Sequence, residues 1–144
     1  MKFLLTFLFL LFFKITLSQD YFERYGPLSD SLENIYGIPS SVMMAIAYHE
    51  SAGGKSKVAK HSNNHFGIKG KNHKVKSAFK YFESDTASYV GFCNLITNKK
   101  FYKTLKGNSD VKKWTRAISK SGYASNSGTW EGKILGIIRK YKLQ

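Results

Sequence analysis

The carboxylates are the residues whose chemistry the sequence limits most, because the 144-residue chain contains only nine Asp and Glu residues. Such side chains are common proton donors and nucleophiles in hydrolytic sites. Glu50 and Glu83 are the candidates for chemistry. Asp85 and Asp110 are predicted to be helix N-caps. The other acids also have ordinary structural explanations, in the N-terminal segment or at the start of a predicted helix, where negative charge is favoured: Asp20, Glu23, Asp30, Glu33 and Glu131.

Glu50 has the strongest position of the nine. It lies near the end of a helix predicted over residues 39–51, which is apolar nearly all round and should be buried. Ile46 and Ala47 lie one turn before Glu50 and share its face. These apolar neighbours and the negative end of the helix dipole both oppose ionisation. A carboxylic acid that keeps its proton is what a general acid requires; an exposed Glu that marks the helix end is the alternative.

The other reactive residue types give weaker patterns. Glu83 follows Tyr81-Phe82 and is a candidate second acid, with an ordinary surface role as the alternative. No metal site is predicted, because no second His follows His49-Glu50 at zinc-protease spacing. The sequence indicates no cofactor, since no glycine-rich phosphate loop is present. The single cysteine, Cys93, is predicted to be buried in a helix.

The elements that must position these residues are mostly helices. Apolar spacing predicts a short helix capped by Ser29 or Asp30 and ended by Gly37, the helix over 39–51, and another near 86–98. Two more follow, one from Val111 to Gly122 and one from near Thr129. Residues 55–74 are predicted to be loop with at most one helical turn, and 75–82 have β character. The expected fold is therefore a single, mainly α domain around a buried central helix, with a small β-hairpin lobe lining a cleft.

The N-terminal residues are predicted to be a signal peptide. Residues 3–13 are apolar except for one Thr, and this run is too short to span a bilayer comfortably. Thr16 and Ser18 suit a cleavage site before Gln19, so residues 1–18 are assigned to the signal peptide and 19–144 to the folded domain. An uncleaved membrane anchor is the alternative; after cleavage, no stable membrane insertion is expected.

The net charge predicts anionic partners. Removing residues 1–18 removes Lys2 and Lys14 and no acid, so the formal charge falls from +14 to +12. Wall polymers, nucleic acids and membrane surfaces are candidate partners for such a protein. Residues 51–82 contain eight lysines, three histidines and no acid, which predicts either a basic rim on the cleft or a solvated surface. Export without a disulfide framework fits a bacterial source.

Four motifs resemble the peptidoglycan glucosaminidases of glycoside hydrolase family 73. Residues 45–56 (AIAYHESAGGKS) resemble the catalytic helix and following turn, and residues 63–70 (NNHFGIKG) resemble an Asn-Asn-x-Phe-Gly-Ile-Lys-Gly segment. Residues 79–84 (FKYFES) resemble the strand before the next helix. Trp114 followed by Ser121–Ser125 (SGYAS) is similar to a Gly-Tyr-Ala motif. The resemblance covers about residues 29–142, in the family's order.

The resemblance implies a lysozyme-like fold that hydrolyses the β-1,4 bond between N-acetylglucosamine and N-acetylmuramic acid. It gives Glu50 the role of general acid and Tyr123 that of a second catalytic-site residue. The implied partner is the peptidoglycan glycan strand, and the implied location is the periplasm or cell wall; a monomer that does not bind nucleic acid is expected. The substrate-binding candidates are Asn64, Phe66, Gly67, Tyr48 and His61.

One departure from the family pattern concerns the second carboxylate. Many members carry it in the β-lobe, where this chain has no acid, so Glu83 or Asp85 would have to reach the cleft from the next helix. Otherwise one acid works alone, with a water held by neutral groups or with the substrate's N-acetyl group assisting. The missing acid also leaves a non-catalytic wall-binding module as the alternative function, and the charge leaves a nucleic-acid-binding protein as a third.

Overall fold

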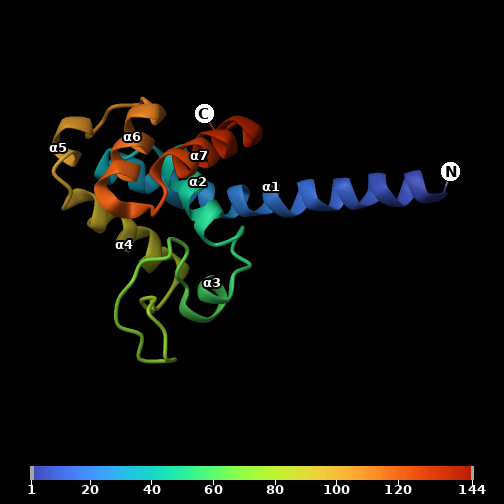
Figure 1. Cartoon of the computed structure of the whole chain (residues 1–144), viewed down its shortest axis with the longest axis horizontal. Coiled ribbons are helices and arrows are strands. Elements are labelled where there is room, and N and C mark those ends of the chain that lie inside the picture. The colour runs from blue at the N-terminus through green and yellow to red at the C-terminus, as the bar shows by residue number, and fades with distance from the viewer. Residues whose placement is uncertain (1, 144) are drawn as a thin grey trace.

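The computed structural model describes the backbone of residues 2–143 and the side chains of residues 19–143. Within that range the helices form one body, and the segment between α3 and α4 forms a loop-rich lobe on one side (Figure 1). The predicted mainly α fold is confirmed. The helical elements are α1 (Lys2–Tyr36), α2 (Ser40–Glu50), α3 (Lys57–Ser62), α4 (Asp85–Thr97), α5 (Tyr102–Leu105), α6 (Val111–Ile118), the π-helical turn η1 (Ser119–Tyr123) and α7 (Ser127–Tyr141).

Helix α2 forms the centre of the core, as predicted. Every residue from Ser41 to Ala47 is buried, and the helix packs against α1 and α7. After Glu50 the chain turns sharply, because Ala52, Gly53 and Gly54 all have positive φ. The Ser51 hydroxyl stabilises this turn by donating to the Ala47 carbonyl at 2.6 Å and accepting from the Gly54 N–H at 2.8 Å. Glu50 therefore lies at the last turn of a rigid, buried helix.

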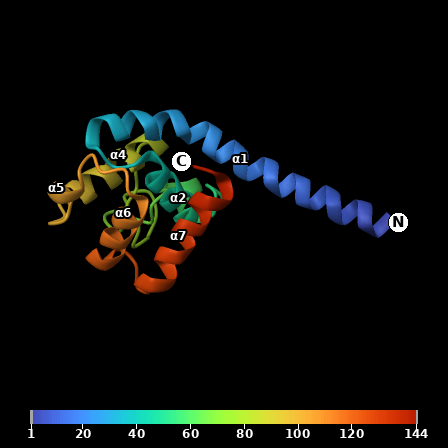
Figure 2. The ribbon, with the colours of Figure 1, turned by 90° about the horizontal axis from the view of Figure 1, so that it is seen from above.

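Helix α1 is much longer than predicted. It continues from Lys2 through Pro27 to Tyr36, so the prediction of a short helix starting at Ser29 or Asp30 is wrong. Tyr21, Tyr25 and Leu32 recur at helical spacing and are buried, and this packed stripe stabilises the helix despite the hydrogen bond that Pro27 cannot make. The N-terminal half of α1 extends away from the body (Figure 2).

The predicted signal-peptide boundary between Ser18 and Gln19 lies within α1. The side chains of residues 1–18 are outside the described part of the structure, so the signal peptide remains a prediction. In the part of the chain searched, none of the helices has the length and apolar character needed to cross a membrane.

The lobe contains less β-structure than predicted. Across residues 2–143, β-pairing is limited to one antiparallel bridge between Lys69 and Phe79, so a hairpin of two strands is not confirmed. The Asn72 side chain accepts from the N–H groups of Lys74 and Val75, at 3.0 and 3.1 Å. Such side-chain bonds to the backbone compete with a β-ladder. The lobe is therefore a loop held by side-chain bonds together with a few backbone bonds, such as those from the Lys80 N–H to the Ile68 carbonyl at 2.8 Å and from the Gly70 N–H to the Ala78 carbonyl at 3.0 Å.

Polar caps begin the later helices. Ser84 caps α4 by accepting from the Ala87 N–H, so the N-cap predicted at Asp85 is wrong by one residue. Asp110 caps α6 as predicted, by accepting from the N–H groups of Lys112 and Lys113. The chain then passes through η1, where Gly122 has a φ of 83°, and places Tyr123 beside the end of α2.

Candidate active site

Two adjoining hollows form a cleft, the larger between the helical body and the lobe and the smaller between the ends of α2 and η1 and the start of α7. The larger has a volume of about 700 Å³ and is lined by Glu50, Phe66, Gly67, Lys69 and Tyr123, among others. The smaller, of about 420 Å³, is lined by His49, Glu50, Tyr123, Asn126 and Trp130, among others. Glu50 and Tyr123 line both hollows, so they lie where the hollows meet.

The Glu50 carboxylate is held by a tryptophan from α7. Trp130 Nε1 donates to Glu50 Oε1 at 2.7 Å, and the indole itself is buried. The other carboxylate oxygen, Oε2, faces Gly67, where an added Cβ would lie 3.7 Å away. Glycine thus leaves space beside Oε2, while the Trp130 bond fixes the orientation of the carboxylate.

Tyr123 connects the wall of the cleft to the lobe. Its hydroxyl donates to the Phe66 carbonyl at 2.7 Å, and its ring lies 5.6 Å from the Trp130 ring. Burial, with a contribution from the Glu50 charge, raises the pKa of the Tyr123 phenol well above its usual value. The phenol is therefore neutral at physiological pH and can donate a hydrogen bond at this position.

Asn64 lies behind the cleft and braces its wall. The residue is buried, and its amide nitrogen donates to the carbonyls of Ile68 and Lys80, both at 2.8 Å. Its amide oxygen accepts from the Ile68 N–H at 3.0 Å. Asn64 thus holds the segment that carries Phe66 and Gly67, but it does not line either hollow.

A buried polar cluster lies on the other side of this segment. His65 Nε2 lies 3.2 Å from Asp85 Oδ1, and the Tyr21 hydroxyl lies 2.8 Å from His65 Nδ1. Because a carboxylate can only accept, we assign the proton to Nε2, and Nδ1 then accepts from Tyr21. Burial lowers the pKa of His65, an effect that Asp85 opposes, and burial raises the pKa of Tyr21 to about 12. A neutral His65, the residue that precedes Phe66, thus connects this segment to Tyr21 of α1 and to Asp85 of α4.

The two candidate second acids do not line the cleft. Asp85 accepts from the Tyr25 hydroxyl at 2.6 Å and pairs with Arg24 at 3.8 Å, in addition to its contact with His65. The Glu83 side chain is 79% exposed and pairs with His73 at 3.8 Å. Among the described residues that line either hollow, Glu50 is the one carboxylate.

Two predicted substrate-binding residues also lie elsewhere. The Tyr48 ring packs between α1 and α7, with ring centroids 4.9 Å from Phe22 and 5.5 Å from Tyr141. His61 is exposed on α3 and lines neither hollow. The structure therefore brings together Glu50, Tyr123, Phe66 and Gly67 but not Tyr48 or His61. Over the part of the chain searched, no group of three or more His, Cys, Asp or Glu side chains is arranged to hold a metal.

Trp130 is the cleft residue that sequence reasoning missed. It is separated from Glu50 by 80 residues, and no local pattern connects the two. The residue type of Trp130 could have indicated this contact, because a buried tryptophan normally finds an acceptor for its N–H. The sequence contains few carboxylates that could serve as that acceptor.

Comparison with known protein families shows which family the chain belongs to. The family model for glucosaminidases, described as mannosyl-glycoprotein endo-beta-N-acetylglucosaminidase, matches residues 26–143. The chain belongs to the glucosaminidase family. Membership confirms the resemblance found in the four motifs and makes the protein a glycoside hydrolase. A search of curated protein sequences found no significant match.

Solved structures share the fold of this glucosaminidase. The catalytic domain of the autolysin Auto from Listeria monocytogenes superposes with a TM-score of 0.74 at 23% identity, covering 89% of this chain and 86% of that one. A glycoside hydrolase domain of FlgJ from Salmonella typhimurium gives 0.70 at 19% identity, with 88% and 99% covered. A peptidoglycan hydrolase from Sphingomonas sp. A1 gives 0.71 at 22% identity, with 87% and 90% covered.

Proposed function

We propose that this glucosaminidase hydrolyses peptidoglycan, cutting the β-1,4 bond between N-acetylglucosamine and N-acetylmuramic acid with Glu50 as general acid. The observation that carries the proposal is the position of Glu50, a carboxylate in an otherwise acid-free lining, at the point where the two hollows meet. A glycan strand can lie along both hollows and so present its bridging oxygen to the middle of the cleft.

The geometry suggests how the proton is delivered. Oε1 accepts from Trp130, so Oε2 is the oxygen that donates to the glycosidic oxygen in the space beside Gly67. Proton donation makes the leaving sugar oxygen a better leaving group as the bond breaks. Tyr123 provides a neutral hydroxyl at the same place, suited to hydrogen bonding with a sugar hydroxyl or acetamido group.

We propose a single-acid mechanism for the second half of the reaction. Asp85 is bonded to Tyr25 and His65, Glu83 is exposed, and neither lines the cleft. The nucleophile is then either a water held by neutral groups or the N-acetyl oxygen of the substrate itself. The eight lysines of residues 51–82 are exposed, and Lys69 lines the larger hollow, which suits a substrate that carries carboxylates.

The cellular location and the oligomeric state of the protein are further parts of this proposal. A wall hydrolase must leave the cytoplasm, which agrees with the predicted signal peptide over residues 1–18. The similar structures include proteins described as an autolysin and a peptidoglycan hydrolase. We propose that the protein works as a monomer in the periplasm or cell wall.

Glu50→Gln tests the proposal. Glutamine keeps an oxygen acceptor for Trp130 but has no carboxyl proton to donate, so the variant should fold normally and lose digestion of purified peptidoglycan. Glu83→Gln makes the same chemical change at an exposed site and should retain wild-type activity. Mass spectrometry of the products identifies which sugar bears the new reducing end and so separates glucosaminidase from muramidase cleavage.

Three results would contradict parts of this proposal. Wild-type digestion by Glu50→Gln would remove Glu50 as the acid. A loss in Glu83→Gln as large as that in Glu50→Gln would identify Glu83 as a second acid. Binding to peptidoglycan without turnover, unchanged by Glu50→Gln, would instead indicate a non-catalytic wall-binding module.

A further inference from the structure

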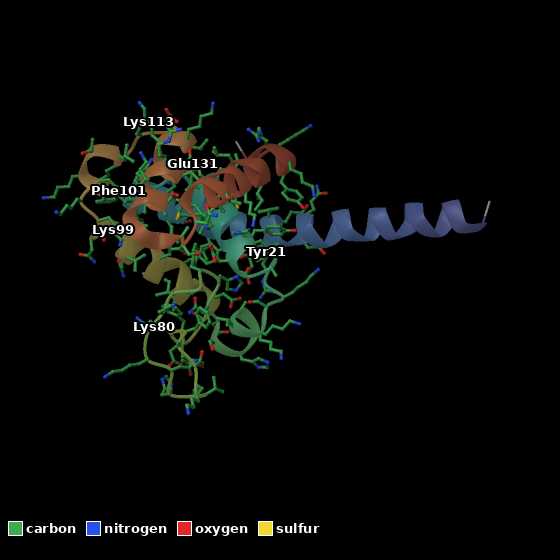
Figure 3. The ribbon with its side chains drawn as sticks, in the orientation of Figure 1. Tyr21, Lys80, Lys99, Phe101, Lys113 and Glu131 are labelled. Atoms are coloured by element: carbon green, nitrogen blue, oxygen red, sulfur yellow. The ribbon has the colours of Figure 1, made fainter. Side chains whose placement is uncertain are left out.

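A second, strongly basic pocket adjoins the cleft. It has a volume of about 410 Å³, and we call it the basic pocket; it is lined by Lys99, Lys100, Phe101, Ala117, Lys120 and Ser121. Its residues come from the turn between α4 and α5, from the end of α6 and from η1. Figure 3 shows Lys99 and Phe101 on the side of the body opposite the extended end of α1. The pocket thus brings three lysines and one aromatic ring together from separate segments.

Within the described side chains, the lysines of the basic pocket pair with no acid. No ion pair joins Lys99, Lys100 or Lys120 to an acid within residues 19–143, and the pocket lining contains no acid. Lys99 is half-buried, while Lys100 and Lys120 are exposed. Three neighbouring positive charges repel one another, so an anion bound among them would relieve that repulsion.

The basic pocket and the larger hollow of the candidate active site share part of their walls. Lys99 lines both the basic pocket and the larger hollow of the cleft. The turn η1 carries Lys120 into the pocket and, three residues later, Tyr123 into the cleft. A group attached to a sugar in the cleft can therefore extend directly into the pocket.

We propose that the basic pocket binds the acidic peptide stem attached to the glycan strand. The Phe101 ring, half-buried against Trp114 at 6.2 Å, offers an apolar surface for the small side chains of such a stem. The lysines offer partners for its carboxylates. An extended stem of a few residues spans more than about 10 Å, at roughly 3.3–3.6 Å per residue, which allows it to reach the pocket from the cleft.

This inference rests on the proposed function, because it assigns part of the same substrate. It predicts that the protein distinguishes glycan strands with stems from strands whose stems have been removed. The shared chemistry is an anion covalently carried by the strand. The phosphates of attached wall polymers are the other source of such an anion, and the substrates below distinguish the two.

The experiment measures the binding of glycan strands to the full chain carrying Glu50→Gln. This variant should leave the bound strands uncut. The test variant adds Lys100→Gln and Lys120→Gln, which leaves the cleft-lining Lys99 intact. The matched control adds Lys112→Gln and Lys140→Gln, which removes the same charge from exposed positions that line neither the cleft nor the basic pocket. Three preparations of purified strands are compared: stem-bearing, stem-free after amidase treatment, and stem-bearing but stripped of phosphate polymers by hydrofluoric acid.

The test variant should bind both stem-bearing preparations about three- to tenfold more weakly than its Glu50→Gln parent, as expected for two exposed charge contacts. The control should weaken binding of all three preparations equally and only slightly, and the affinity of the test variant for stem-free strands should match that of the control. About 0.5 M salt should remove the difference.

Equal weakening on stem-free and stem-bearing strands would overturn the assignment, as would no weakening at all. An effect that disappears with the phosphate polymers would also overturn it and identify the phosphates as the ligand. Failure of the proposed function is seen separately, as digestion by Glu50→Gln or as no digestion by the wild-type chain.

Discussion

Replacing Trp130 with phenylalanine removes one hydrogen-bond donor from Glu50 and leaves much of the aromatic surface in place. In the wild-type chain the Trp130 Nε1 to Glu50 Oε1 distance is 2.7 Å, and both groups lie beside the same hollow. Glu50 becomes charged as it gives up its proton, and a hydrogen bond to a charged group contributes about 1.5–3 kcal/mol. If that contribution is made in the transition state, its loss lowers kcat by roughly 10- to 150-fold.

Trp114→Phe is a matched control for this variant. Trp114 is fully buried, and its Nε1 donates to the Asn108 carbonyl, also at 2.7 Å, but it lines neither hollow. Both substitutions should lower the free energy of unfolding by about 1–3 kcal/mol, from the lost bond and the space left by the smaller ring. Only Trp130→Phe should reduce kcat on purified peptidoglycan.

The assay combines thermal unfolding with the rate of reducing-end formation at saturating substrate. Each kcal/mol of lost stability lowers Tm by about 2–4 °C in a chain of this size, so the rates are compared well below both transitions. A kcat for Trp130→Phe within twofold of wild type, with Glu50→Gln inactive, would refute the view that Trp130 orients the acid. Equal losses of kcat in both tryptophan variants would refute it as well.

Three further outcomes test the cleft and its support. Tyr123→Phe removes the hydrogen bond to the Phe66 carbonyl and should lower kcat more than it raises KM, by at least severalfold; a change in KM alone would contradict a role in turnover. Asn64→Ala removes three hydrogen bonds to the Ile68 and Lys80 backbone and should lower stability by about 2–4 kcal/mol in denaturant unfolding, so an unchanged midpoint would contradict the bracing role. Burial holds the folded-state pKa of His65 below its ordinary value of 6.5, so the unfolded chain binds more protons there. The contribution of His65 to stability is therefore complete above about pH 6.5 and is lost as the pH falls through the folded-state pKa; Tm measured from pH 7.5 to 5.5 should fall, and His65→Gln should flatten that dependence.

The parts of the fold that follow local rules were predictable. The buried helix containing Glu50, the helix near residues 86–98 and the Asp110 cap were predicted from apolar spacing and capping residues, and the structure confirms them. The extent of α1 was not predictable in the same way. Pro27 and Gly26 suggest a break, but the packing of Tyr21 and Tyr25 against the core stabilises a continuous helix.

The assignment of the acids likewise was predictable where local rules applied and was not predictable where distant contacts decided it. Elimination among nine carboxylates left Glu50 and Glu83 as candidates, and the position of Glu50 at the end of a buried helix favoured it over Glu83. The sequence predicted Asp85 as the N-cap of α4. Ser84 is the N-cap instead, and Asp85 contacts Tyr25 and His65. Local pattern cannot distinguish two adjacent capping residues when the deciding partners come from α1 and the lobe.

The sequence by itself determined the family, the central helix and the acid at its end, because motif order and helical periodicity are local properties of the chain. Only the tertiary structure decided that Trp130 holds Glu50, that Glu83 and Asp85 lie outside the cleft, and that Lys99, Lys100 and Lys120 share a pocket. These are contacts between residues far apart along the chain. They depend on how the helices pack around α2, and no spacing within a single segment encodes that packing.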